Sequence, residues 1–160
     1  MNNLTQKEKT LLQDQKTHEE ICIKKYNDYA NQAQDPQLKQ IFSANAKQEQ
    51  QHLDTINQII SGQVPSMNQN QQQQGQKGSQ GQGMQSTQSM NTGSGSKNDA
   101  DLCNDILMTE KYVSGAYDTA IYEFRDTNIR QTLNHIQKEE QQHGESVFKY
   151  MESKGLYKPQ

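Results

Sequence analysis

The tetrapeptide Glu-Gln-Gln-His occurs twice in this chain, at residues 49–52 and 140–143. Each copy places a carboxylate and an imidazole three positions apart, so that on a helix both side chains project from one face. These two groups together bind transition-metal ions such as iron or manganese. One Glu-x-x-His motif is weak evidence for a metal site, but two copies 91 residues apart require a common explanation.

The elements that must position these motifs are helices, marked at their ends by capping residues. Thr5 with Glu8 forms a capping box, and Asp35 precedes a proline at a first helical position. The other expected caps are Asn98 or Asp99, Asp126 or Thr127, and, just past two helix ends, Gly62 and Gly155. These signals predict four helices, each longer than about 20 residues and typical of a bundle: roughly 5–33, 36–61, 99–125 and 127–154.

One face of each expected helix has the 3-4 residue spacing of a face that packs inside a bundle. On the third helix this stripe is apolar from Cys103 to Phe124 except at Glu110. On the first helix, where the stripe is more polar, the spacing selects Glu19 in preference to Glu20. Four glutamates and two histidines are thus expected to point inward: Glu19, Glu49, His52, Glu110, Glu140 and His143.

A constant shift of 91 positions lays the second half of the chain on the first. Besides the two motifs, it aligns Glu19 with Glu110, Tyr26 with Tyr117, Asp35 with Asp126 and Leu38 with Ile129. We interpret this as an internal duplication of a helical hairpin.

Burying these groups predicts a metal site. A buried, unpaired carboxylate is costly and four together repel one another, whereas two cations would relieve both penalties. Glutamates from two helices plus Glu-x-x-His from two others form the ligand set of ferritin-like di-iron and di-manganese proteins. We therefore predict an all-α, ferritin-like four-helix bundle with two Fe or Mn ions. Glu49 and Glu140 would bridge the ions, Glu19 and Glu110 would be terminal, and His52 and His143 would each bind one ion.

The alternative is that both motifs form a solvated charged face, because both lie in Gln- and Glu-rich surroundings. Tyr26 and Tyr117 lie two turns, about 10 Å, beyond the glutamates of their own helices. We expect them to be core aromatics and not ligands. His18 and His135 fall outside the stripes and are expected at the surface, and Cys22 is expected to be a buried thiol.

The middle of the chain has a different composition, rich in Gln, Gly, Ser and Asn without apolar periodicity. Such a segment cannot bury enough apolar surface to fold, so we expect a disordered linker. Only 29% of the 160 residues are hydrophobic, which agrees with a core confined to the flanks. We therefore divide the chain into a first hairpin (1–62), a crossover linker (63–98) and a second hairpin (99–160), with the two hairpins packed as one bundle.

Charge and hydropathy argue against several classes of protein. The net charge of −3 comes from mixed charges without the basic stripe of a nucleic-acid binder. No apolar run approaches the ~18 residues of a membrane span, and the first fifteen residues lack the apolar core of a signal peptide. The two cysteines, Cys22 and Cys103, lie in helical patterns and are expected to be reduced thiols of a cytosolic product, although two cysteines can always pair.

Two stretches resemble a known family. "DPQLKQIF", which opens the second expected helix, and the ending "HGESVFKYMESKGLYKP" are similar to the coat F type of spore coat proteins from endospore-forming bacteria. The resemblance implies a ferritin-like bundle made in the mother-cell cytoplasm and deposited in the spore coat. It implies other spore coat proteins as partners, with further copies of the same chain also allowed. Members of this family need not keep metal ligands, whereas this chain has all six.

Two functions therefore remain open from the sequence. The first is a structural coat protein, whose Gln-rich linker, lysines and Tyr157 would suit interaction or cross-linking. The second is a di-metal oxidoreductase of the peroxidase, catalase or ferroxidase type, acting on peroxide, dioxygen or Fe(II). The six-residue set favours metal binding but does not distinguish chemistry from structural stabilisation.

Limited proteolysis tests the predicted organisation. Because the segment 63–98 lacks an apolar period, a protease should cleave there first and leave two helical fragments that stay associated. Early cleavage within 5–61 or 99–154, with 63–98 resistant, would contradict this division of the chain.

Overall fold

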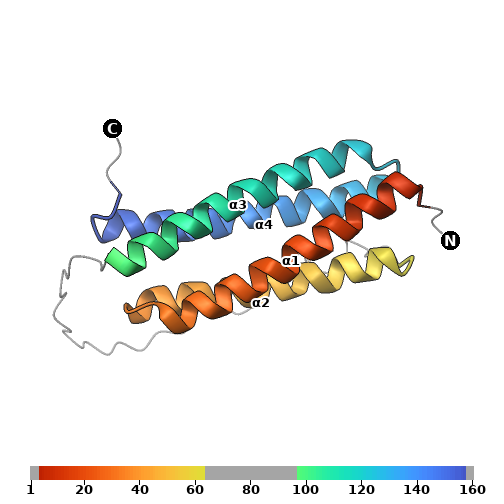
Figure 1. Cartoon of the computed structure of the whole chain (residues 1–160). Coiled ribbons are helices and arrows are strands. Elements are labelled where there is room, and N and C mark those ends of the chain that lie inside the picture. Colours follow the sequence, from red (N-terminus) through yellow and green to blue (C-terminus); the bar gives the residue numbers. More distant parts are fainter. Residues whose placement is uncertain (1–3, 64–96, 158–160) are drawn as a thin grey trace, which may run out of the picture.

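The protein is described by a computed structural model that covers residues 4–63 and 97–157. Within these ranges it consists of four α-helices and contains no strand (Figure 1). This confirms the all-α bundle predicted from the sequence. The helices are α1 (Gln6–Gln32), α2 (Pro36–Ile60), α3 (Lys97–Glu123) and α4 (Thr127–Ser153). The predicted linker lies almost entirely in 64–96, outside the described residues.

The four helices are arranged as two antiparallel hairpins that pack side by side, α1 with α2 and α3 with α4 (Figure 1). Between the hairpins, α1 contacts α3 and α2 contacts α4. Both of these pairs are also antiparallel, so α2 and α3 run in the same direction. The end of α2 and the start of α3 therefore lie at opposite ends of the bundle.

The helix ends follow from local capping chemistry. Thr5 and Glu8 form the predicted capping box, and the side chains of Asp35 and Asp126 cap α2 and α4. At the end of α4, Gly155 has φ +68° and the N–H of Leu156 donates to the carbonyl of Met151 at 2.8 Å, as in a Schellman motif.

The start of α3 differs from the sequence-based expectation. The helix is already formed at Lys97, so Asn98 and Asp99 lie in its first turn. Asp99 is buried, and its carboxylate accepts hydrogen bonds from the backbone N–H groups of Gln34 at 2.8 Å and Asp35 at 3.0 Å. These belong to the turn that connects α1 to α2. Asp99, one of the two residues expected to cap α3, thus binds the first hairpin instead. The sequence of α3 alone does not show this contact.

The apolar core has two parts. One cluster near the start of α1 includes Leu12, Ile56 and Phe124. The other, near the end of α1, includes Leu38 and Phe42. The buried acidic residues and histidines named from the sequence occupy the helix segments between these clusters. Apolar packing on both sides thus holds the polar groups in a water-poor interior.

The 91-residue repeat is visible in contacts between the hairpins. Glu8, in the first turn of α1, accepts a hydrogen bond from the backbone N–H of Arg125 at 3.0 Å, in the turn between α3 and α4. The 91-residue shift places Glu8 on Asp99 and Gln34 on Arg125. In the equivalent contact, Asp99 of the second hairpin accepts a hydrogen bond from the backbone N–H of Gln34 in the first. The two halves are therefore related by approximate two-fold symmetry, as a duplicated hairpin predicts.

Glu8 should contribute pH-dependent stability. Burial alone would raise the pKa of its carboxyl, but hydrogen bonds from Arg125 and Thr5 outweigh burial and lower it from 4.5 to about 2. A lowered pKa stabilises the fold above pH 4.5, and this stabilisation is lost as the pH falls from 4.5 to about 2. We expect Glu8→Gln to reduce the free energy of unfolding by about 2 kcal/mol at pH 7, measured by urea denaturation, and by much less near pH 2.

The control is Glu123→Gln. Glu123 forms an exposed ion pair with Lys7 (2.6 Å), of the kind that contributes little to stability. A loss in Glu8→Gln that matches the control, or that stays constant between pH 7 and pH 2, would contradict the role given to Glu8.

Candidate metal centre

All six residues predicted as metal ligands lie together in the interior of the bundle. Each is at most 4% exposed. They form two overlapping groups in which one ligand atom from each residue lies within 4.8 Å of the others. The first group is Glu19, Glu49, His52 and Glu140, and the second is Glu49, Glu110, Glu140 and His143. Glu49 and Glu140 belong to both, which is the arrangement expected of bridging carboxylates.

Because α2 and α4 pack antiparallel, the histidine of each Glu-Gln-Gln-His motif lies next to the glutamate of the other motif. Nδ1 of His52 lies 3.1 Å from Oε1 of Glu140, and Nδ1 of His143 lies 3.1 Å from Oε1 of Glu49. Within each motif the carboxylate and imidazole are 3.3 and 3.4 Å apart, as the i,i+3 spacing predicts. The two imidazole rings stack with centroids 5.7 Å apart. Each histidine therefore faces both shared carboxylates.

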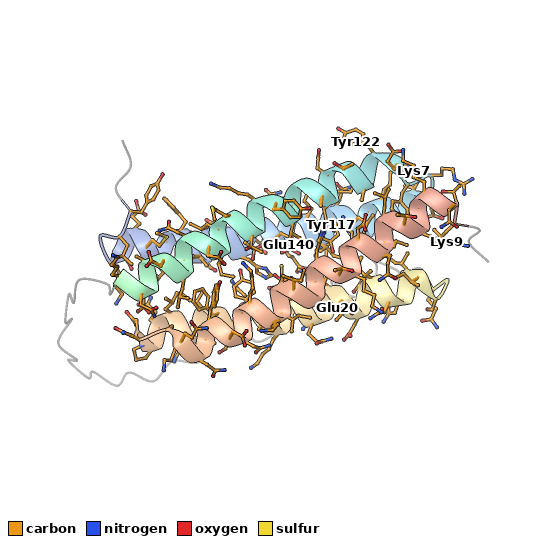
Figure 2. All side chains as sticks on the ribbon, viewed as in Figure 1. Lys7, Lys9, Glu20, Tyr117, Tyr122 and Glu140 are labelled. Atoms are coloured by element: carbon orange, nitrogen blue, oxygen red, sulfur yellow. The ribbon has the colours of Figure 1, made fainter. Side chains whose placement is uncertain are left out.

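Glu19 and Glu110 complete the two groups from the other pair of helices. Glu19 Oε2 lies 3.6 Å from Nδ1 of His52, and Glu110 Oε1 lies 3.7 Å from Nδ1 of His143. Glu20, the neighbouring alternative, is exposed and lies within 4.0 Å of Lys16 (Figure 2). The 3-4 residue spacing on the first helix and the 91-residue repeat thus correctly indicated Glu19, and not Glu20, as the residue that faces the interior.

The alternative interpretation of a solvated charged face is wrong, because all six side chains are buried. Of the other histidines, His135 is exposed, as expected. His18 is only half-buried and packs edge-on against Tyr112, with ring centroids 5.4 Å apart. Cys22 is a buried free thiol, also as expected.

Two tyrosines contribute to the site in a way that the sequence did not reveal. Tyr26 and Tyr117 are fully buried, as expected of core aromatics. The hydroxyl of Tyr26 also donates to Glu110 Oε1, and that of Tyr117 donates to Glu19 Oε1. Their distance from the glutamate on their own helix is irrelevant, because each reaches the glutamate of the antiparallel helix. The available signal was their match under the 91-residue shift.

Glu139 also contacts the candidate centre, and the sequence did not single it out. Its Oε2 lies 2.9 Å from Nε2 of His52, on the side of the ring away from the shared carboxylates. A carboxylate in this position fixes the orientation of a ligand imidazole. The equivalent atom on the other side, Nε2 of His143, is buried without a hydrogen-bond partner among the described residues.

Burial and mutual repulsion govern protonation in the cluster. Burial raises the pKa values of Glu19 and Glu110 well above their usual range, and the charges of Glu140 and Glu49 add to the effect. Burial would also raise the pKa of Glu140, but hydrogen bonds from His143 and His52 lower it. Burial would lower the pKa values of both histidines, but contacts with carboxylates raise them: first Glu139 and then Glu140 for His52, and Glu140 and Glu49 for His143. Protons thus balance the charge of the glutamates, and a metal ion would have to displace them.

The donor atoms fit a pair of hard or borderline cations. Oε2 of Glu19, Glu110 and Glu140 are buried and have no hydrogen-bond partner within the described part of the chain. Buried polar atoms normally have a partner, so three such oxygens in one cluster favour a ligand that supplies positive charge. Carboxylates with imidazoles suit Fe or Mn better than ions that prefer thiolate.

Comparison with known proteins gives a family match over the second hairpin. Residues 98–160 match the model of the Coat F domain. The chain is also 37% identical over 60 residues to the uncharacterized protein YusN of Bacillus subtilis (strain 168). That alignment covers 38% of this chain and 54% of YusN, so the chain spans about half the length of this relative.

No solved structure matches the chain. None of the four described helices is long and apolar enough to cross a membrane. The family match covers nearly all of α3, all of α4 and the ending that was singled out from the sequence. Residues 98–160 are therefore similar to the Coat F domain, in agreement with the resemblance noted at the ending of the sequence.

Proposed function

We propose that this chain is a spore coat protein whose helical bundle is ferritin-like and holds two Fe or Mn ions. The Coat F match supports the coat assignment. The observation that carries the metal proposal is the pair of buried residue groups that share Glu49 and Glu140. Other coat proteins are the proposed partners, and synthesis in the mother-cell cytoplasm is the proposed step before deposition.

The direction of the helices supports a ferritin-like arrangement. In such bundles a long crossover joins the second helix to a third that runs parallel to it. Here α2 and α3 run in the same direction, and a segment of more than thirty residues separates them. The first helix of each hairpin supplies one glutamate, and the second supplies a Glu-x-x-His motif.

Each residue has a distinct proposed role at the centre. Glu49 and Glu140 would be shared between the two ions, Glu19 and Glu110 would be terminal ligands, and each histidine would bind one ion. Tyr26 and Tyr117 orient the terminal carboxylates through the hydrogen bonds described above. When bound, Fe or Mn would supply Lewis-acid and one-electron redox chemistry.

The second candidate function is a di-metal oxidoreductase of the peroxidase, catalase or ferroxidase type. The placement of four carboxylates in the core favours it, because an apolar core would usually stabilise a pure scaffold at least as well. The two functions are compatible if the protein is deposited in the coat and remains active there.

Metal loading tests the centre. After incubation with Fe(II) or Mn(II) and removal of free metal, elemental analysis of the full chain should approach two equivalents per chain. Glu140→Ala should weaken the binding of both ions, because Glu140 belongs to both groups. His143→Ala and Glu19→Ala should each weaken one, by at least about tenfold.

The matched control for Glu19→Ala is Glu20→Ala. Glu20 is adjacent in sequence and exposed, so its removal should leave loading unchanged. Wild-type protein that binds neither metal, or equal losses in these two variants, would refute the proposed centre.

Location and activity test the biological role. A tagged chain expressed during sporulation in Bacillus subtilis should be recovered in extracted spore coats and not in vegetative cells. Metal-loaded protein should consume hydrogen peroxide or oxidise Fe(II) faster than Glu140→Ala. Equal rates, together with normal deposition of the variant, would leave the scaffold function alone. Abundance in vegetative cells and absence from coats would favour a soluble oxidoreductase.

A further inference from the structure

A groove on the outer face of the second hairpin leads to the candidate metal centre. It lies between α3 and α4 and has a volume of about 720 Å³. Its lining includes Glu110 and Glu140, two residues of the centre. Both are buried, and Oε2 of each has no hydrogen-bond partner in the described ranges. The inner end of the groove is therefore formed by two residues of the candidate centre.

Two glycines inside helices make room for this groove. Gly115 of α3 and Gly144 of α4 both line it, and neither has a positive φ. A Cβ at Gly115 would meet nothing within 4 Å. At Gly144 it would be 3.9 Å from Cδ2 of Leu107 and 4.0 Å from Cβ of Glu110, which is ordinary contact. Glycine destabilises a helix interior relative to alanine, and neither backbone conformation nor close packing requires it here.

The first hairpin has larger side chains at the matched positions. The 91-residue shift places Lys24 opposite Gly115 and Leu53 opposite Gly144. The ligand residues are the same in the two halves, whereas these two positions are not. The difference opens only the side of the second hairpin at these positions, next to Glu110.

The charges along the groove favour a cation. Glu110 and Glu140 lie at its inner end, and Asp118 and Glu145 line it farther out. Lys111 is the one basic side chain among the lining residues, and Lys149 pairs with Glu145 at 2.6 Å. A cleft whose walls carry mainly one sign of charge concentrates ions of the opposite sign.

We propose that this groove between α3 and α4 is the route by which free divalent cations enter the candidate centre. The inference rests on the proposed function, since it requires that the centre binds metal. An incoming ion passes Asp118, meets the side chains of Glu110 and Glu140 at the inner end of the groove, and continues inward to Glu49. Filling the groove should slow entry without removing a ligand.

The test measures the rate of Mn(II) uptake by the full chain, followed by the loss of the electron paramagnetic resonance signal of free Mn(II). Gly115→Lys and Gly144→Leu each introduce the residue found at the matched position of the first hairpin. We expect each to slow uptake about tenfold, with the final stoichiometry unchanged. Asp118→Asn should slow uptake less, and added salt should slow the wild type.

Gly115→Ala and Gly144→Ala are the controls, because a single Cβ fits at both positions. They should load at the wild-type rate, and circular dichroism should show that all variants are folded. Wild-type rates in both Gly115→Lys and Gly144→Leu, with full loading, would overturn the groove as the entry route and leave the metal centre standing. Wild-type protein that binds no Mn(II) would refute the centre itself and the route with it.

Discussion

Repulsion between four glutamate carboxylates in a water-poor interior is the constraint around which this bundle is organised. The apolar clusters on either side contain no charge that could offset it. Relief comes from groups held within the polar layer itself: two imidazoles facing the shared glutamates and two tyrosine hydroxyls donating to the terminal ones. Within the described residues, three carboxylate oxygens of the cluster still have no hydrogen-bond partner. Protons held by Glu19, Glu110 and the two histidines offset the remaining repulsion, and bound cations would replace those protons.

Much of this relief comes from contacts that cross from one hairpin to the other. Tyr26 of the first hairpin supports Glu110 of the second, and Tyr117 of the second supports Glu19 of the first. Glu8 and Asp99 likewise bind the turn of the opposite hairpin. A single hairpin would therefore expose these acidic groups without their partners. The Coat F match covers the second hairpin, but its buried polar residues depend on both.

Much of the centre could be predicted from the sequence because it depends on helical periodicity. The i,i+3 spacing and the apolar stripes place six residues inward whatever the exact register between helices. The roles of Tyr26, Tyr117 and Glu139 depend on that register, since each acts on a residue of another helix. The contact of Asp99 with the turn of the first hairpin also depends on that register, so the sequence indicates only a possible cap of its own helix. Local rules describe a helix well, but they do not specify which residues of two antiparallel helices meet.

The departures from the repeat make the two halves of the centre unequal. Glu139 lies beside Nε2 of His52, and a carboxylate there favours a proton on that nitrogen, which leaves Nδ1 available toward the shared carboxylates. The position matched to Glu139 in the first hairpin is Gln48, and Nε2 of His143 has no hydrogen-bond partner among the residues described. The groove adjoins Glu110, which belongs to the same half as His143. Among the described residues, His52 thus has partners at both ring nitrogens, whereas His143 has partners at Nδ1 only and lies beside the open side of the bundle. The two hairpins carry the same buried glutamates and histidines at matched positions, and a few differences around them give each half a different environment.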